Sequence, residues 1–239
     1  MKGVNSFNSE WQQNMICKEI KIFSQNIWKN SLLINTILEV KTNFDIIFIQ
    51  ELSWSSICSI PSSSNCKGET LVGMVNHPNW LKFIRSNTNE SEYPRVAIYI
   101  NIRLSSLCFS IWKDVINHRD ILLASFFNNG DIFWLMNVYS DASHSALKYL
   151  KNTGVNIRNF LVMAGDFNIR NSLWDSSFPH HSSISNDLII IVDSFHLSLS
   201  SFINQVVMGR LNTNIFLFLL SIFLDFIFLF FWISFSFSF

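Results

Sequence analysis

FLVMAGDFNI, at positions 160–169, is the stretch of sequence that decides the fold. Its first residues are apolar and predict a buried β-strand, which ends in Gly-Asp-Phe-Asn. Such a strand end places the carboxylate of Asp166 and the carboxamide of Asn168 together at the rim of a sheet. A carboxylate can orient or deprotonate a water there, and an amide can donate a hydrogen bond to a phosphoryl oxygen. The same residues also form ordinary turns, so the rest of the chain has to decide between the two interpretations.

Three other polar residues follow short apolar runs in the same manner. They are Asn26, Glu51 and Tyr139. Each of them, taken alone, can be a cap or loop residue, a solvated strand end or an aromatic at the edge of the core. Because the ends of neighbouring strands share one rim of a sheet, and sites form at such rims, the joint pattern favours a common polar site.

The order of the predicted elements indicates an α/β fold with mixed sheets. Strands outnumber helices, and Asn129-Gly130-Asp131 is a hairpin signal between two of the strands. Hairpins favour a sandwich of mixed sheets over a purely parallel, doubly wound sheet. The predicted strands are 20–26, 45–49, 95–100, 121–127, 132–138 and 160–163, the predicted helices are 31–42, 143–152 and 186–196, and the Ser-rich segment 53–69 is a predicted loop.

Composition restricts the classes of function. The 239 residues carry 17 basic and 17 acidic side chains without a basic stripe, which excludes a strong electrostatic nucleic-acid binder but not an enzyme that binds DNA weakly. The N-terminus is polar and contains no secretory signal. Adjacent histidines on a loop, His180 and His181, are not expected to chelate one metal ion. The cysteines lack zinc-site spacing and predict free thiols in a reducing compartment; they are Cys17, Cys58, Cys66 and Cys108.

Four motifs occur in the order and approximate spacing of the endonuclease/exonuclease/phosphatase superfamily. They are Ser24-Gln25-Asn26, Ile49-Gln50-Glu51, Asn137-Val138-Tyr139-Ser140 and Gly165-Asp166-Phe167-Asn168. Between about residues 20 and 204 the chain resembles this superfamily, and more narrowly the endonuclease domain of non-LTR (LINE-type) retrotransposons. The narrower resemblance also rests on Asn117-His118-Arg119-Asp120-Ile121, Ser172-Leu173-Trp174-Asp175 and Phe178-Pro179-His180-His181-Ser182.

The resemblance implies a fold, a reaction and a role for each motif residue. The fold would be a four-layer α/β sandwich, with two mixed β-sheets packed face to face and helices outside. The reaction would be Mg²⁺-dependent phosphodiester hydrolysis that nicks DNA, with Mn²⁺ as an alternative ion. Glu51 would hold the metal, Asn26 would support the metal and the phosphate, and Tyr139 would contact the scissile phosphate. Asp166 would orient or deprotonate the attacking water, and Asn168 would stabilise the developing oxyanion.

The superfamily's last motif, a C-terminal Ser-Asp-His, has no counterpart in this chain. No histidine follows residue 200, and Asp225 is the only carboxylate there. We therefore expect an incomplete, C-terminally truncated domain at 20–205, preceded by an N-terminal extension at 1–19. One edge of the second sheet would then be unpaired. The rate of hydrolysis would be reduced, because a general acid or base is lost.

A linker at 206–214 and a hydrophobic, Phe-rich tail at 215–239 are expected to follow this domain. The segment 215–233 contains one charge and predicts a helix of about 28 Å, close to the bilayer core of about 30 Å. This helix would anchor the chain in a membrane. A translated noncoding, pyrimidine-rich tract would have the same composition, because its codons encode Phe, Leu and Ser.

Three functions stay open on these grounds. The first is the retrotransposon-type endonuclease, with DNA as substrate, a reverse transcriptase domain as partner in the intact element, and a nuclear or cytoplasmic location. The second is a non-catalytic remnant held at a membrane through 215–233. The third is a phosphomonoesterase or lipid-phosphate hydrolase of the same superfamily, which the Asn-Val-Tyr-Ser and His-Arg-Asp segments disfavour.

Overall fold

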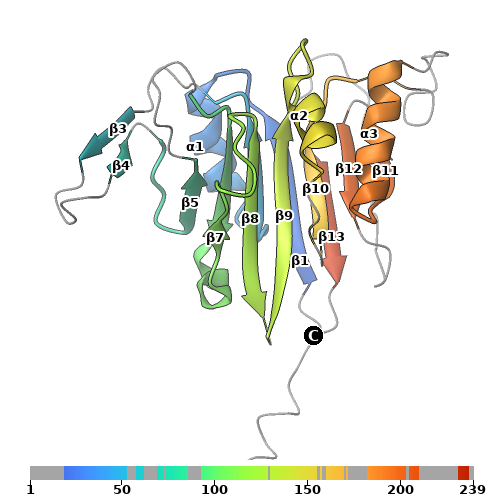
Figure 1. Ribbon diagram of the computed structural model, residues 1–239. Helices are drawn as coiled ribbons and strands as arrows, with labels where there is room; N and C mark the ends of the chain where they lie inside the picture. The colour runs from blue at the N-terminus through green and yellow to red at the C-terminus, as the bar shows by residue number, and fades with distance from the viewer. Residues whose placement is uncertain are drawn as a thin grey trace, which may run out of the picture.

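Two mixed β-sheets form the centre of the protein, as a computed structural model shows (Figure 1). The first sheet has five strands in the order β13-β1-β2-β6-β5, and the second has six in the order β11-β12-β10-β9-β8-β7. Strands β3 and β4 form a separate two-stranded sheet. The structure describes residues 19–52, 58–61, 69–72, 74–85, 93–128, 130–154, 157, 160–169, 171, 182–202, 205–209 and 231–236.

Six strands and three helices lie where the sequence predicts them, and seven further strands among the described residues were not predicted. The first sheet consists of β1 (Glu19–Asn26), β2 (Ile46–Gln50), β5 (Trp80–Ile84), β6 (Val96–Asn101) and β13 (Phe231–Ser236). The second consists of β7 (Ser110–Ile111), β8 (Ile121–Asn128), β9 (Asp131–Tyr139), β10 (Phe160–Asp166), β11 (Ser198–Phe202) and β12 (Gln205–Gly209). The remaining elements are the hairpin of β3 (Cys58–Pro61) and β4 (Glu69–Val72), a 3₁₀ helix η2 (Ile102–Leu107), and the helices α1 (Ser31–Val40), α2 (Ser145–Thr153) and α3 (Ser183–Ser194).

Each sheet contains one parallel pair of strands. β1 pairs with β2 in parallel, and β9 pairs with β10 in parallel, whereas the other neighbours are antiparallel. Each parallel pair is joined by a crossover that contains a helix, α1 in the first sheet and α2 in the second. The sequence prediction of two mixed sheets is thereby confirmed.

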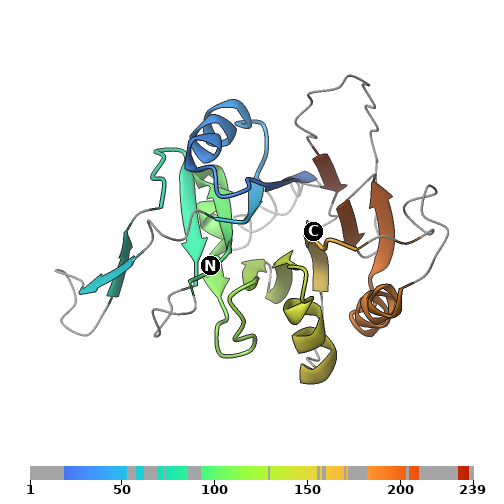
Figure 2. The same ribbon diagram turned by 90° about the horizontal axis from the view of Figure 1, so that it is seen from above.

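Alternation of apolar residues along the strands builds three cores. On β2, Ile46 and Phe48 face the second sheet, whereas Ile47 and Ile49 face α1. On the second sheet, the outward face packs against α2 and α3. The order of layers is therefore α1, first sheet, second sheet, and then α2 with α3, which is the expected four-layer arrangement (Figure 2).

A buried polar cluster joins the two sheets just below one rim. The side-chain amide of Gln50 donates hydrogen bonds to Asn137 Oδ1 at 2.6 Å and to Ser24 Oγ at 3.1 Å. The Asn137 amide donates to the carbonyls of Ile49 at 3.0 Å and Ala97 at 2.8 Å. Gln50 and Asn137 are fully buried, so these hydrogen bonds fix how the sheets face each other where the site lies.

The expected C-terminal hydrophobic helix is not confirmed. Residues 231–233, at the end of the predicted helix, lie in β13, which pairs antiparallel with β1 from Glu19↔Ser236 to Ser24↔Phe231. Backbone N–H and C=O groups at the outer edge of β1 find partners in this strand, and its aromatic and β-branched residues suit a strand. No helix among the described residues has the length and apolar content needed to cross a bilayer.

Some other predictions differ from the structure, and some concern residues that the structure does not describe. β12 takes up the start of the segment predicted as a linker, 206–214, and β3 lies inside the predicted loop 53–69. Outside the described residues lie most of the N-terminal extension, the tail segment 215–230, His180 with His181, and Cys17 with Cys66. The domain boundaries stay predictions.

Candidate active site

The residues predicted from the sequence lie at one rim, where four strands end. β1 ends at Asn26 and pairs in parallel with β2 in the register Asn26↔Gln50, which places Glu51 directly beyond it. β10 ends at Asp166 and pairs in parallel with β9 in the register Asp166↔Tyr139. Parallel pairing therefore brings both strand ends of each sheet to the same rim.

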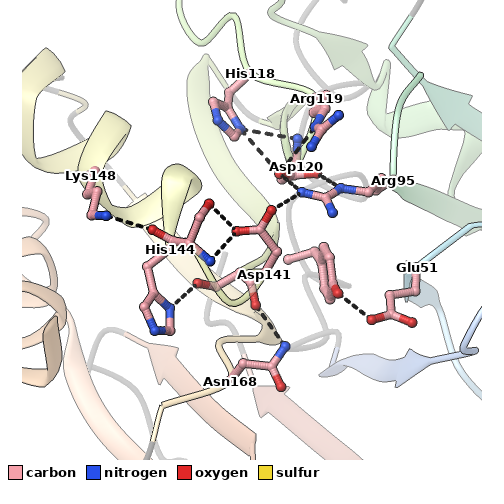
Figure 3. A network of polar contacts seen from close by, with 12 residues as sticks. Glu51, Arg95, His118, Arg119, Asp120, Asp141, His144, Lys148 and Asn168 are labelled. Atoms are coloured by element: carbon pink, nitrogen blue, oxygen red, sulfur yellow. Dashed lines mark hydrogen bonds and ion pairs between the residues drawn. The ribbon is translucent and has the colours of Figure 1, made fainter. Parts of the chain in front are cut away.

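Two hydrogen bonds cross from one sheet to the other at this rim. The Asn26 side-chain amide donates to Asp166 Oδ2 at 2.6 Å, which joins β1 to β10. The Tyr139 hydroxyl donates to Glu51 Oε1, which joins β9 to the end of β2 (Figure 3). The four side chains thus form two cross-sheet pairs that the sequence could indicate only as separate strand ends.

Asn168 closes a turn over Asp166. Its backbone N–H donates to Asp166 Oδ1 at 3.1 Å, and its side-chain amide donates to the carbonyl of Ser140 at 2.7 Å. The backbone of Asn168 is left-handed, with φ of +49°, a conformation that asparagine tolerates better than most residues. The amide nitrogen carries a second N–H, which is free to donate a hydrogen bond to a phosphoryl oxygen.

Gly165 is required by the close approach of β10 to β9. Its φ is +154°, and a Cβ at this position would lie 1.8 Å from the carbonyl oxygen of Val138. A side chain cannot fit there, so the glycine of the Gly-Asp-Phe-Asn motif allows the register that places Asp166 opposite Tyr139.

Burial and charge raise the pKa of Asp166. Its removal from water is the larger cause, and the nearby negative charge of Glu51 adds to it. The hydrogen bonds from Asn26 and Asn168 oppose this shift only in part. A carboxylate with a raised pKa is a stronger base, which suits a group that takes a proton from water.

Tyr139 remains a phenol at neutral pH. Burial and the hydrogen bond to Glu51 both raise the pKa of its hydroxyl. The ring packs in the core between the sheets, and only the hydroxyl reaches the rim. Tyr139 is therefore a hydrogen-bond donor held in place by the core.

Arg95, Asp120 and Asp141 hold the Tyr139 ring in place. The sequence did not single them out as site residues. The Arg95 guanidinium binds Asp120 with two hydrogen bonds and Asp141 with one of 2.8 Å (Figure 3). It lies 4.8 Å from the centre of the Tyr139 ring. Asp120 is fully buried. These residues come from three separate segments, so the only sequence signal was the His-Arg-Asp stretch that contains Asp120.

His144 is a further residue of the site. Its Nδ1 lies 2.9 Å from the hydroxyl of Ser140, the residue whose carbonyl accepts the hydrogen bond of Asn168. Burial lowers the pKa of His144, the charge of Lys148 lowers it further, and Asp141 opposes them. The imidazole is therefore neutral at neutral pH. Its backbone is left-handed, with φ of +53°, at the start of α2.

The donor set of the rim suits a hard divalent cation. Glu51 and Asp166 place carboxylate oxygens at this rim, and the charge of Glu51 contributes to the raised pKa of Asp166. Mg²⁺ ordinarily binds one or two carboxylates and keeps several waters, so Glu51 is a residue that could hold it. In the described ranges, no group of three or more His, Cys, Asp or Glu side chains has the arrangement of a metal site.

The fold of this chain is also found among solved structures. One of them is the endonuclease domain of TRAS1, a telomere-specific non-LTR retrotransposon; the TM-score is 0.55 at 11% identity, over 81% of this chain and 86% of that chain. At this identity the likeness concerns the fold.

Two further solved structures are similar at lower scores. A humanized D. rerio TDP2 has a TM-score of 0.43 at 13% identity, over 82% of this chain and 85% of its own. An endonuclease/exonuclease/phosphatase family protein from Bacteroides thetaiotaomicron has a TM-score of 0.40 at 11% identity, over 83% and 85%. No family model and no curated protein sequence matches the chain.

Proposed function

We propose that this protein is a divalent-metal-dependent phosphodiesterase that nicks DNA in the manner of a retrotransposon endonuclease. The observation that supports this most is the pair of cross-sheet hydrogen bonds, Asn26 to Asp166 and Tyr139 to Glu51, at a single rim. The fold shared with the TRAS1 endonuclease domain agrees with it.

In this proposal each side chain of the rim acts on a different part of the phosphodiester. Asp166 accepts a proton from the attacking water, and its raised pKa makes it a better base. Asn26 holds the Asp166 carboxylate in position through its amide. The Tyr139 hydroxyl, whose single O–H would turn from Glu51 to the substrate, and the second N–H of Asn168 donate hydrogen bonds to the phosphoryl oxygens as their negative charge increases.

Glu51 would hold Mg²⁺ or Mn²⁺ in this scheme, and Asp166 would stay free to accept the proton of the attacking water. A bound metal ion supplies Lewis-acid stabilisation of negative charge at the phosphorus and at the leaving oxygen. We propose a lower rate than that of a complete superfamily domain, because β13, which borders β1, consists of Phe, Trp, Ile and Ser and offers no carboxylate or imidazole.

A non-catalytic remnant is the second candidate, and the absent Ser-Asp-His motif favours it. Partnership with a reverse transcriptase domain, a nuclear or cytoplasmic location, and membrane attachment through 215–233 remain proposals that belong to one or other candidate. A phosphomonoesterase or lipid-phosphate hydrolase remains the third.

Nicking of supercoiled plasmid separates the first candidate from the second. We expect the purified chain to nick plasmid in the presence of Mg²⁺ or Mn²⁺, and Asp166→Asn to lower the rate by roughly 10²- to 10⁴-fold, because the base is lost. Asp131→Asn, at the exposed hairpin at the opposite end of β9, is the matched control and should nick at the wild-type rate. Equal nicking by wild type and Asp166→Asn would remove the assignment.

A further inference from the structure

An exposed tryptophan borders the candidate active site. Trp28 lies two residues after Asn26, in the turn that follows β1, and 63% of its surface is exposed. Its φ is +46°, and that of Lys29 is +62°, so two successive residues with side chains adopt the left-handed conformation. This conformation is a genuine outlier for a bulky aromatic residue, and such strain gathers at functional sites.

Residues of the candidate active site hold this turn. The backbone N–H of Trp28 donates to Asn26 Oδ1 at 2.8 Å, so the Asn26 side chain binds Trp28 through its oxygen and Asp166 through its nitrogen. The backbone N–H of Lys29 donates to the carbonyl of Glu51 at 2.8 Å. These backbone hydrogen bonds hold Trp28 beside the rim, and its side chain is exposed to solvent rather than packed in the core.

Exposed indole surface is unfavourable in water unless another apolar surface covers it. Nucleobases provide such a surface, because every base has a π-face that can stack on an aromatic ring without sequence preference. The chain has no net charge and no basic stripe, so electrostatic attraction to DNA is weak and stacking would have to supply affinity. Lys29, exposed next to Trp28, adds one local positive charge.

We propose that Trp28 is a stacking platform for an unpaired nucleobase beside the scissile phosphate, and that Lys29 contacts a neighbouring phosphate of the same strand. A base can cover the ring only when it has left its own stack, so the substrate is single-stranded or locally unpaired at this nucleotide. The inference rests on the proposed function, since it names the form of DNA that this site accepts.

Binding of two fluorescent oligonucleotides tests the inference without requiring cleavage. One probe is a short oligothymidine, and the other is an oligonucleotide of the same length made of abasic sites, both titrated with the full chain in EDTA and followed by anisotropy. We expect wild type to bind oligothymidine about tenfold more tightly than the abasic probe, which is the ordinary effect of one stacked base.

Substitutions at Trp28 should remove this preference. Trp28→Ala and Trp28→Asn should each bind the two probes with equal affinity. Asparagine tolerates the left-handed backbone better than most residues, so Trp28→Asn removes the ring without disturbing the turn. Lys29→Gln should weaken both probes alike and reduce the dependence of binding on salt. Phe127→Ala is the control, since Phe127 is 50% exposed near the opposite end of β8.

The outcomes distinguish this inference from the proposed function. A preference for oligothymidine that persists in both Trp28 variants, or that is absent in wild type, would overturn the stacking site even if the plasmid is nicked. A preference that only the Trp28 variants lose supports the stacking site even if Asp166→Asn and wild type nick equally, in which case the proposed hydrolysis alone fails.

Discussion

Arg95 shows how a charge can serve the candidate site without facing the substrate. Its guanidinium is shared between Asp120, Asp141 and the face of the Tyr139 ring. A planar fork with several donors can satisfy two carboxylates at once, which a lysine ammonium cannot do with the same geometry. Arg95 therefore holds the ring whose hydroxyl donates to Glu51, and it acts as a positioning residue.

Stability at low pH should report the pair of Arg95 and Asp141. Burial tends to raise the pKa of Asp141, but the hydrogen bonds from Ser143 and the charge of Arg95 outweigh it and hold the pKa well below its usual value. Stability from such a group is fully present above the ordinary pKa of about 4 and is lost as pH falls through the lowered pKa. Asp141→Asn should therefore have a lower Tm than wild type at neutral pH.

The difference in Tm should shrink as pH falls well below about 4, because Asp141 then becomes protonated in the wild-type protein as well. Thermal unfolding followed by circular dichroism over this range gives the measurement, with the exposed Asp131→Asn as the reference variant. A difference in Tm that stays constant down to the lowest pH would show that the ion pair does not stabilise the fold.

Among single residues, the sequence could indicate those that end a strand and could not indicate those that pair across the chain. Asn26, Glu51, Tyr139 and Asp166 follow apolar runs, and the joint pattern of these strand ends predicted that they share one rim. Asp141 and His144 become part of the site only through contacts with Arg95 and Ser140, which no local pattern contains.

At the scale of elements, the approach of β10 to β9 depends on one missing side chain. Gly165 opposes Val138 in the parallel register, and the space that a Cβ would need is already occupied by a carbonyl oxygen. The same contact sets the position of Asp166 relative to Tyr139.

Gly165→Ala should destabilise the protein by about 3 kcal/mol, because the backbone has to move to accept the methyl group and the positive φ adds strain. Gly130→Ala, where φ is +93° but nothing lies within 4 Å, should show only the backbone part, about 1 kcal/mol. Urea unfolding measures both values. Equal losses in the two variants would show that the contact with Val138 is unimportant.

The strands and helices that carry the site agree with the predictions, and those that differ have weak local patterns. β2, β6, β8 and β9 are mostly apolar, which predicts buried strands well. β3 and β4 enclose a Ser-rich segment, so their short strands were hidden in a predicted loop. β13 belongs to a tail whose length and hydrophobicity suggested a helix, because a uniformly apolar run has no period that separates strand from helix.

At the scale of the whole molecule, two large sheets are held in one relative position by a small polar cluster. Gln50 and Asn137 lie between apolar layers, and the Asn137 amide also satisfies two backbone carbonyls of the first sheet. Hydrogen bonds buried between the sheets favour one arrangement, whereas apolar contacts alone allow small shifts, although the Gln50 side-chain oxygen itself has no hydrogen-bond partner.

Asn137→Leu should lower the free energy of unfolding by about 2 kcal/mol, because the Gln50 amide keeps only its hydrogen bond to Ser24 and the carbonyls of Ile49 and Ala97 lose the one from Asn137. The double variant with Gln50→Leu should lose less than the sum of the single variants, since the two side chains share one interaction. Asn152→Ala, on the exposed face of α2, is the control. Strict additivity in urea unfolding would show that the pair is not coupled.

The pairing of β1 with β13 has a consequence for the order of folding. The first strand of the sheet meets its outer neighbour about two hundred residues later, at Ser24↔Phe231. Contacts so distant in sequence form slowly, because the entropy cost of closing a long loop comes before the contacts stabilise the fold. During synthesis β1 can pair with β2 early, but its other edge stays open until β13 has emerged from the ribosome, and a nascent neighbour could occupy that edge first.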